Sequence, residues 1–223
     1  FDGHPATSTG ATTVSVDNCV SAPPGVIAWW PGNGNAQDII GGNHGTLESG
    51  VSYTTGQVGT NQAFSFNGST LISRSAPSTL DLNGNQVTVD GWINPTVVSG
   101  DAIYFGKTGN STNDFVVLRL FNQLVGIVKV NGTEVMAVSG FDPPANTWTH
   151  IAMTYNNSAV QLYVNGTATG APTVASGNIT NDGVTFGIQI PSASRSMNRE
   201  RVLSSFAIFR REGREADADV AGD

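Results

Sequence analysis

The sequence has almost no sulfur chemistry, few charges and no long apolar run. It contains one cysteine, Cys19, so no disulfide can form within the chain. It has no run of about eighteen apolar residues, the length that would indicate a membrane-spanning helix. Charged residues make up 12% of the chain and the net charge is −7, so the basic face that a nucleic-acid partner requires is missing. These absences argue against an internal disulfide framework, a membrane span and nucleic-acid binding.

What the chain has instead is turn residues between short apolar segments. It holds 27 glycines and 10 prolines among 223 residues, 39% of them hydrophobic, which predicts many short strands joined by tight turns in one large all-β domain. Strands are predicted over 26–30, 63–66, 86–93, 102–106, 114–121, 124–130, 133–138, 147–155, 159–164, 184–190 and 202–209.

Two Asn-Gly pairs, at 131–132 and 165–166, predict two-residue hairpins, because Asn-Gly favours the positive φ angles of type I′ turns. The strand before the second pair alternates with period two. This alternation places Val160 and Leu162 in the core and Tyr163 on the outer face.

The two ends of the chain differ from its middle. Residues 1–24 are polar and end in two prolines, with a strand-like alternation at Val14 and Val16, and they predict an arm or linker carrying one potential strand. Residues 211–223 form a charged tail with both signs interleaved. The first residue is not methionine, and Ser, Thr, Asn and Gly are abundant. We therefore expect an exported product or an excised fragment that works outside the cell.

Four phrases occur in an order that resembles the laminin G-like domains of the concanavalin A-like lectin and glucanase superfamily, especially the bacterial secreted branch. They read GVIAWWPGNGNAQDIIGGNHGTL, GQVGTNQAFSFNGSTLIS, VTVDGWINPT and TWTHIAMTYNNSAVQLYVNG. The resemblance implies a two-sheet antiparallel jelly-roll sandwich over residues 25–210. It also implies core or near-core positions for the four tryptophans, Trp29, Trp30, Trp92 and Trp148.

The resemblance further implies calcium in the loop after the first strand. Asp38 and Asn43 stand where the ligands of the family would be, and backbone oxygens near Gly41 and His44 would assist. The sequence departs from the family at Ser204, where an aspartate would complete the ion shell. The alternative is that Asp38 caps the turn and accepts hydrogen bonds from nearby amides.

A sugar site needs exposed aromatic rings, and the resemblance assigns all four tryptophans to structural positions. Tyr53, Tyr104 and Tyr163 remain for stacking, and the segment 106–113 would supply polar contacts, with Lys107, Asn110 and Asn113 as the candidates. The candidate ligand-binding set is Tyr104, Lys107, Asn110 and Asn113.

Catalytic patterns are scarce. The chain has five glutamates, and none lies in the Glu-x-Asp-x-x-Glu strand with which relatives in the superfamily hydrolyse polysaccharides. His150 lies in a strand phrase typical of a packed histidine, and no nucleophile elbow or P-loop occurs. We expect no enzyme.

Two functions remain. The first is an extracellular recognition or adhesion module that binds glycans or cell-surface proteins, with calcium. The second is a self-associating protomer of a fibre or surface layer, in which the arm adds to a sheet edge of the next subunit and Cys19 reinforces the joint. The arm has two further interpretations, an interdomain linker and a strand that pairs within its own sandwich.

Overall fold

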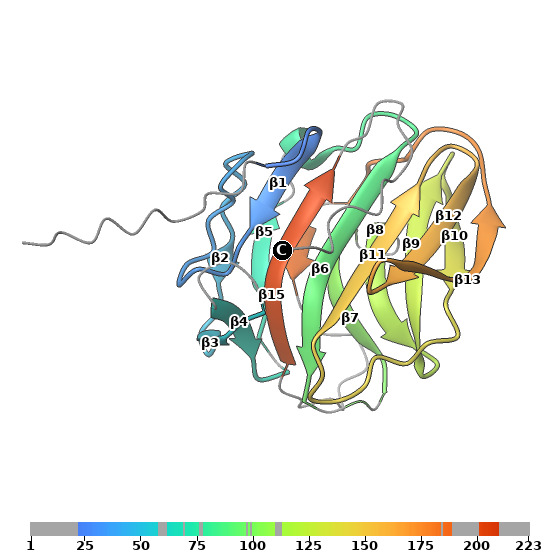
Figure 1. Cartoon of the computed structure of the whole chain (residues 1–223). Helices are drawn as coiled ribbons and strands as arrows, with labels where there is room; N and C mark the ends of the chain where they lie inside the picture. Colours follow the sequence, from blue (N-terminus) through green and yellow to red (C-terminus); the bar gives the residue numbers. More distant parts are fainter. Residues whose placement is uncertain are drawn as a thin grey trace, which may run out of the picture.

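A computed structural model of the chain describes residues 22–57, 62–68, 70–75, 78–96, 98, 100–109, 113–183, 185–188 and 201–209. These residues form two antiparallel sheets packed face to face, with a single three-residue 3₁₀ helix, η1 (Ser78–Leu80). Figure 1 shows the two layers, with β15, β6 and β11 in the front layer and β7, β8 and β9 behind them. The predicted all-β jelly-roll sandwich is confirmed.

The front layer, sheet A, has eight strands. Its order is β13 (Thr167–Val174), β12 (Ala159–Val164), β11 (Thr149–Tyr155), β6 (Val87–Pro95), β15 (Arg201–Phe209), β4 (Gln62–Phe66) and β3 (Ser52–Thr55), and β1 (Val26–Trp30) also pairs with β15. The last strand, β15, pairs with β1, β4 and β6. It therefore brings the first and the last strand of the described chain together.

The back layer, sheet B, has seven strands. Its order is β10 (Thr133–Val138), β9 (Gln123–Val130), β8 (Asn113–Leu120), β7 (Ala102–Thr108), β14 (Thr185–Ile188), β5 (Ile72–Ser75) and β2 (Thr46–Leu47). Three consecutive hairpins, β7–β8, β8–β9 and β9–β10, build four of its seven strands from chain neighbours.

The two Asn-Gly hairpins form as predicted. Asn131 and Gly132 have φ angles of 48° and 81°, and Asn165 and Gly166 have 49° and 77°, so both central residues of each turn lie in the left-handed region. Val130 pairs with Thr133 across the first turn, which fixes the register of β9 and β10.

The core is filled from both sheets by aromatic rings. The ring of Trp30 on β1 stacks 4.7 Å from Phe186 on β14 and 5.5 Å from Phe206 on β15, and Phe105 on β7 lies 4.3 Å from Phe206. Trp30 is fully buried, and truncating a tryptophan at such a position costs about 3–5 kcal/mol.

The other three tryptophans, Trp29, Trp92 and Trp148, are only partly buried. Trp30 is thus a core residue, whereas the other three have the partial burial of near-core positions. Trp92 lies on the face of β6 that points away from the core.

Four strands were not predicted: β2, β3, β5 and β13. The first three are two to four residues long, too short for a periodic pattern to stand out. β13 contains Gly170 and Pro172, which favour a break, but both are tolerated because β13 lies at the end of sheet A. Residues 1–21 of the predicted arm, with Val14, Val16 and Cys19, and the tail 211–223 lie outside the described residues.

Among the described residues, none belongs to a helix with the length and apolarity needed to span a bilayer.

Candidate functional site

Half of the side chains of β6 point away from the core. Its burial alternates strictly, with Val87, Val89 and Ile93 buried, while Asp90 and Trp92 on the opposite face are partly exposed. Such alternation is expected for a strand with one face on the core and one on solvent. The outer face of sheet A therefore carries a tryptophan and a carboxylate side by side.

The neighbouring strands add complementary side chains to this face. Trp92 pairs with His150 on β11, and their rings lie 5.3 Å apart with their planes tilted by 59°. Asp90 pairs with Ala152 on β11, which in turn pairs with Tyr163 on β12. We call these five residues, Asp90, Trp92, His150, Ala152 and Tyr163, the sheet A platform.

The platform is polar as well as aromatic. His150 Nε2 lies 3.7 Å from Asp90 Oδ1, and the two side chains are 18% and 20% exposed. This distance is too long for a hydrogen bond, so both groups keep hydrogen-bonding capacity toward solvent or a ligand. Aromatic faces next to an acceptor and an imidazole are suited to ligands that have both apolar and hydroxyl surfaces.

The predicted metal loop is organised around Asp38, which is 2% exposed. Its Oδ1 accepts hydrogen bonds from the backbone N–H groups of Trp29 (2.8 Å), Ile40 (3.0 Å) and Gly41 (3.0 Å). Its Oδ2 accepts two more, from the backbone N–H and the side-chain amide of Asn43, both at 2.9 Å. Both carboxylate oxygens are thus occupied by donors of the chain itself.

The same hydrogen bonds set the charge of Asp38. Burial pushes its pKa upward, but the backbone N–H groups of Trp29, Ile40, Asn43 and Gly41 outweigh burial and hold the pKa below its ordinary value. The ionised carboxylate is stabilised by donors and needs no cation beside it.

The other predicted calcium ligands are also engaged. Asn43 Oδ1 accepts a hydrogen bond from Thr79 Oγ1 at 2.5 Å, and the Asn43 carbonyl accepts one from the Trp30 indole at 3.0 Å. His44 is exposed, and its carbonyl accepts a bond from Arg74 at 3.1 Å. In this arrangement Asp38 and Asn43 do not fit a calcium site, because their oxygens already accept hydrogen bonds from the chain itself. Within the described part of the chain, no group of three His, Cys, Asp or Glu side chains is placed to hold a metal.

Gly41 is needed for packing. A Cβ at this position would lie 2.2 Å from the Ile27 carbonyl oxygen and 2.9 Å from Asp38 Oδ2. Glycine is required here because the backbone of the loop passes against β1 and the carboxylate.

The predicted ligand-binding residues do not form an exposed surface. Tyr104 is 2% exposed and belongs to the core, so its ring cannot stack on a ligand at the surface. Asn113 donates from its backbone and its side chain to Glu134 Oε1, at 2.6 and 3.0 Å. Asn110 lies outside the described residues.

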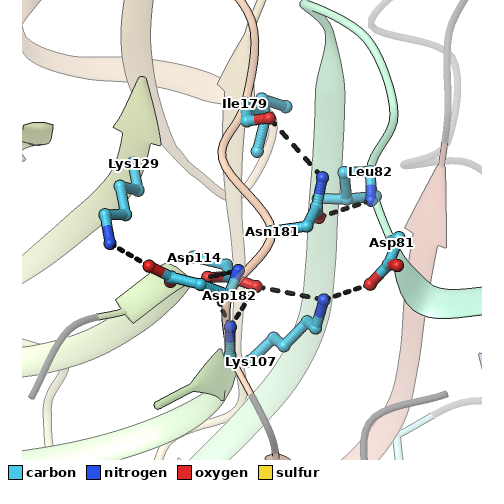
Figure 2. A network of polar contacts seen from close by, with 9 residues as sticks. Asp81, Leu82, Lys107, Asp114, Lys129, Ile179, Asn181 and Asp182 are labelled. Atoms are coloured by element: carbon cyan, nitrogen blue, oxygen red, sulfur yellow. Dashed lines mark hydrogen bonds and ion pairs between the residues drawn. The ribbon is translucent and has the colours of Figure 1, made fainter. Parts of the chain in front are cut away.

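Lys107 is buried in an ionic network at one end of sheet B (Figure 2). Its Nζ lies 2.5 Å from Asp81 Oδ1 and 3.0 Å from Asp114 Oδ2. Asp114 also accepts bonds from the backbone N–H groups of Asp182 and Gly183. Burial raises the pKa of Asp114 above its ordinary value, although Lys107 and these amides favour its charged form. Lys107 therefore ties Asp81 to Asp114 on β8, and Asp114 holds the segment around residue 182.

A model of the concanavalin A-like lectin/glucanases superfamily matches residues 67–200, more than half of the chain. The chain belongs to this superfamily. The family resemblance in the sequence is thereby confirmed. A search among curated proteins found no match.

Solved structures share the sandwich of this superfamily member at low identity. The binding domain of Paraclostridial Mosquitocidal Protein 1 aligns with a TM-score of 0.66 and 18% identity over 82% of this chain and 48% of that chain. The binding domain of botulinum neurotoxin serotype G aligns with a TM-score of 0.65 and 16% identity over 85% and 48%. The chain spans about half the length of these two domains.

A third structure is matched over most of its length. Domain 4 of AbnA, a GH43 extracellular arabinanase from Geobacillus stearothermophilus, was solved in complex with arabinotriose. It aligns with a TM-score of 0.58 and 16% identity over 83% of this chain and 92% of that domain. Identities this low show a shared fold.

The platform was missed in the sequence because tryptophans in family strand phrases were expected to be structural. The signal was present for Trp92, since the apolar residues of 87–93 fall on alternate positions and leave Trp92 on the other face. Tyr163 was among the tyrosines expected to be free for stacking, but its position beside Ala152 and Asp90, and that of His150 beside Trp92, required strand pairing and register, which the sequence does not reveal.

Proposed function

We propose that this lectin/glucanase superfamily member is a non-catalytic module that recognises carbohydrate outside the cell. The observation that carries the proposal is the match with AbnA domain 4, because that domain has arabinotriose bound and is covered over 92% of its length. Further support comes from the toxin binding domains with the same sandwich, one of them described by its interaction with two ganglioside molecules.

The proposed module works by binding rather than by hydrolysis. Glycosidases of the common types need two carboxyl groups that flank the scissile bond, one of them free to donate a proton. The two most buried carboxylates described here, Asp38 and Asp114, are instead surrounded by N–H donors and Lys107. In this proposal recognition does not run through calcium, because the oxygens of Asp38 and Asn43 are already engaged.

The proposal is tested on the full chain with an immobilised glycan panel containing neutral, amine-bearing and anionic oligosaccharides, followed by calorimetry on each hit. We expect saturable binding of at least one carbohydrate class, with and without a calcium chelator. If no oligosaccharide binds at millimolar concentration, the carbohydrate-recognition function is wrong. Release of reducing sugar from a bound glycan would contradict the non-catalytic part.

Self-assembly is the second candidate, and the edge of sheet A favours it. Among the described strands, β3 pairs only with β4, so its other edge presents backbone N–H and C=O groups. Its sequence, Ser-Tyr-Thr-Thr, contains no proline or charge that would discourage an added strand. An incoming arm with Val14 and Val16 would pair there. A solution-mass measurement tests this candidate.

A further inference from the structure

The sheet A platform combines aromatic rings, one small residue and hydrogen-bonding groups across three adjacent strands. Asp90, Ala152 and Tyr163 lie directly opposite one another on β6, β11 and β12. Because neighbouring strands are about 4.8 Å apart, Asp90 and Tyr163 are separated by roughly 10 Å across the sheet. This width suits an extended ligand that lies across the strands.

A small residue lies between the two larger ones. Ala152 is 8% exposed and lies between the larger side chains of Asp90 and Tyr163. One step along the strands, Trp92 and His150 form the adjoining row, since residues two apart on a strand share a face. The arrangement places two aromatic side chains, Trp92 and Tyr163, on the same face of three adjacent strands.

The side chains of the platform have the chemistry that binds a sugar. An indole and a phenol ring present apolar faces, against which the C–H side of a sugar ring packs. Among the described residues, His150 is the only polar partner of the Asp90 carboxylate, and it lies 3.7 Å away. A sugar hydroxyl can therefore donate a hydrogen bond to Asp90 and form a second hydrogen bond with the imidazole of His150.

The negative charge of the platform and of the chain favours some classes of sugar over others. Asp90 lies within the platform, and the chain as a whole carries a net charge of −7. Like charges repel most strongly where they are partly shielded from water, so sialylated, sulfated or uronic-acid ligands are disfavoured. Neutral sugars, and sugars with a free amine, are compatible with this site.

We propose that the sheet A platform is the carbohydrate site of this chain and that it takes neutral or amine-bearing oligosaccharides. The inference rests on the proposed function and goes further, because it assigns residues and a ligand class. It places the site on the outer face of sheet A, whereas the sequence pointed to Tyr104 and Lys107.

The test uses the full chain and five variants: Trp92→Ala, Tyr163→Ala, Asp90→Asn, His150→Ala and, as control, Phe121→Ala. Phe121 is the matched control because it is an aromatic residue 72% exposed on the β8–β9 turn of sheet B. The probes are arabinotriose, cellohexaose, chitosan hexamer and a heparin hexasaccharide, each titrated by calorimetry. Urea unfolding of every variant checks that the fold is retained.

We expect the wild type to bind a neutral or amine-bearing probe and to ignore heparin. Trp92→Ala and Tyr163→Ala each weaken binding at least tenfold, His150→Ala weakens it several-fold, and Phe121→Ala leaves it unchanged. Asp90→Asn keeps a hydrogen-bonding group, so it changes neutral-sugar binding by less than about threefold and lowers the discrimination against heparin.

Two outcomes would overturn the inference, and only one of them would also overturn the proposed function. If the wild type binds a probe while Trp92→Ala and Tyr163→Ala bind it equally well, the site lies elsewhere and the proposed function stands. If the wild type binds none of the probes nor any sugar on the panel, the proposed function fails as well. Should Trp92→Ala unfold, Tyr163→Ala decides alone, because the core contacts of β12 come from Val160 and Leu162.

Discussion

At the scale of single residues, the carboxylate of Asp38 explains why a glycine- and asparagine-rich loop is ordered. Five N–H donors from one short segment and from β1 converge on two oxygens. A metal ion would order such a loop by the opposite arrangement, in which oxygens of the loop surround a positive charge. The pattern of residues is compatible with both solutions, and only the directions of the N–H groups separate them.

Replacement of Asp38 by asparagine tests this anchor. One oxygen becomes an amide, so buried N–H groups lose their acceptor, and we expect the free energy of unfolding at pH 7 to fall by about 2–4 kcal/mol. Because the folded pKa of Asp38 is lowered, its contribution is complete above the ordinary value near 3.8 and is lost as pH falls through the folded pKa. The stability difference between wild type and variant should therefore shrink below about pH 4, as measured by urea unfolding. A constant difference down to pH 2 would contradict the assignment.

Calcium dependence gives a second residue-scale prediction. A ligand that binds only the folded state at a hundred times its Kd stabilises by about 2.7 kcal/mol. Since the oxygens of Asp38 and Asn43 are engaged, we expect the urea midpoint to be the same in millimolar calcium and in excess EDTA. A calcium-dependent rise that disappears in Asp38→Asn would show that the loop opens to take the ion.

Gly41 and Gly42 provide a matched pair in the same loop. In Gly41→Ala the new methyl group would meet the Ile27 carbonyl oxygen at 2.2 Å, so the loop must shift away from β1. In Gly42→Ala the methyl group meets nothing within 4 Å, and the cost comes only from a φ of 68°. We expect about 1 kcal/mol of destabilisation for Gly42→Ala and clearly more for Gly41→Ala, by urea unfolding. Equal losses would mean that the close approach is relieved without cost.

At the scale of elements, the ionic network shows how a loop is fixed to a sheet. Asp114 is fully buried beside Lys107, whereas Lys129 pairs with Asp182, a carboxylate that is 51% exposed (Figure 2). Removing one member of a buried pair leaves a charge in a medium of low polarity, but an exposed partner is solvated by water. The two lysines therefore contribute very differently despite similar distances.

Lys107→Met and Lys129→Met measure this difference. We expect Lys107→Met to lower the free energy of unfolding by about 3–5 kcal/mol, since Asp114 would be left buried without its cation. Lys129→Met should cost about 1 kcal/mol or less, because Asp182 stays hydrated. The double variant Lys107→Met/Asp114→Asn should recover part of the loss. Equal effects of the two lysines in urea unfolding would show that burial of the partner is not what matters.

The elements also show how far the sequence leads. Period-two alternation and Asn-Gly turns predicted β6, β9, β10 and β12 close to their observed bounds, because these signals are local. The pairing of β6 with β11 joins residues some sixty positions apart, and that register brings Asp90, Trp92 and His150 together. Strand order is decided by packing of the whole sandwich, so the platform could not be assembled from the sequence, even though the exposure of Tyr163 was predicted.

At the scale of the whole molecule, the two lateral edges of the sandwich differ. At one edge, Thr169 and Thr173 of β13 donate side-chain hydrogen bonds to the backbone oxygens of Ser139 and Met136, which ties sheet A to sheet B. Pro172 on β13 further discourages an added strand. At the other edge β3 has none of these protections. Self-association through backbone pairing is therefore expected at β3 if it occurs at all.

Solution mass by light scattering after size exclusion separates a recognition module from an assembling protomer. The carbohydrate-recognition proposal predicts a monomer of 23.2 kDa over a wide range of protein concentration, in calcium and in chelator alike. A mass that rises with concentration would contradict the expected monomer and favour addition of a strand to β3. Such addition builds open polymers, because the contact is heterologous.

Two variants then separate the possible causes of polymer formation. Cys19→Ser abolishes polymers held by a disulfide, and Thr54→Pro abolishes those that need the β3 edge, since proline removes a donor from the strand. Persistence of the polymer in both variants would place the contact elsewhere on the molecule.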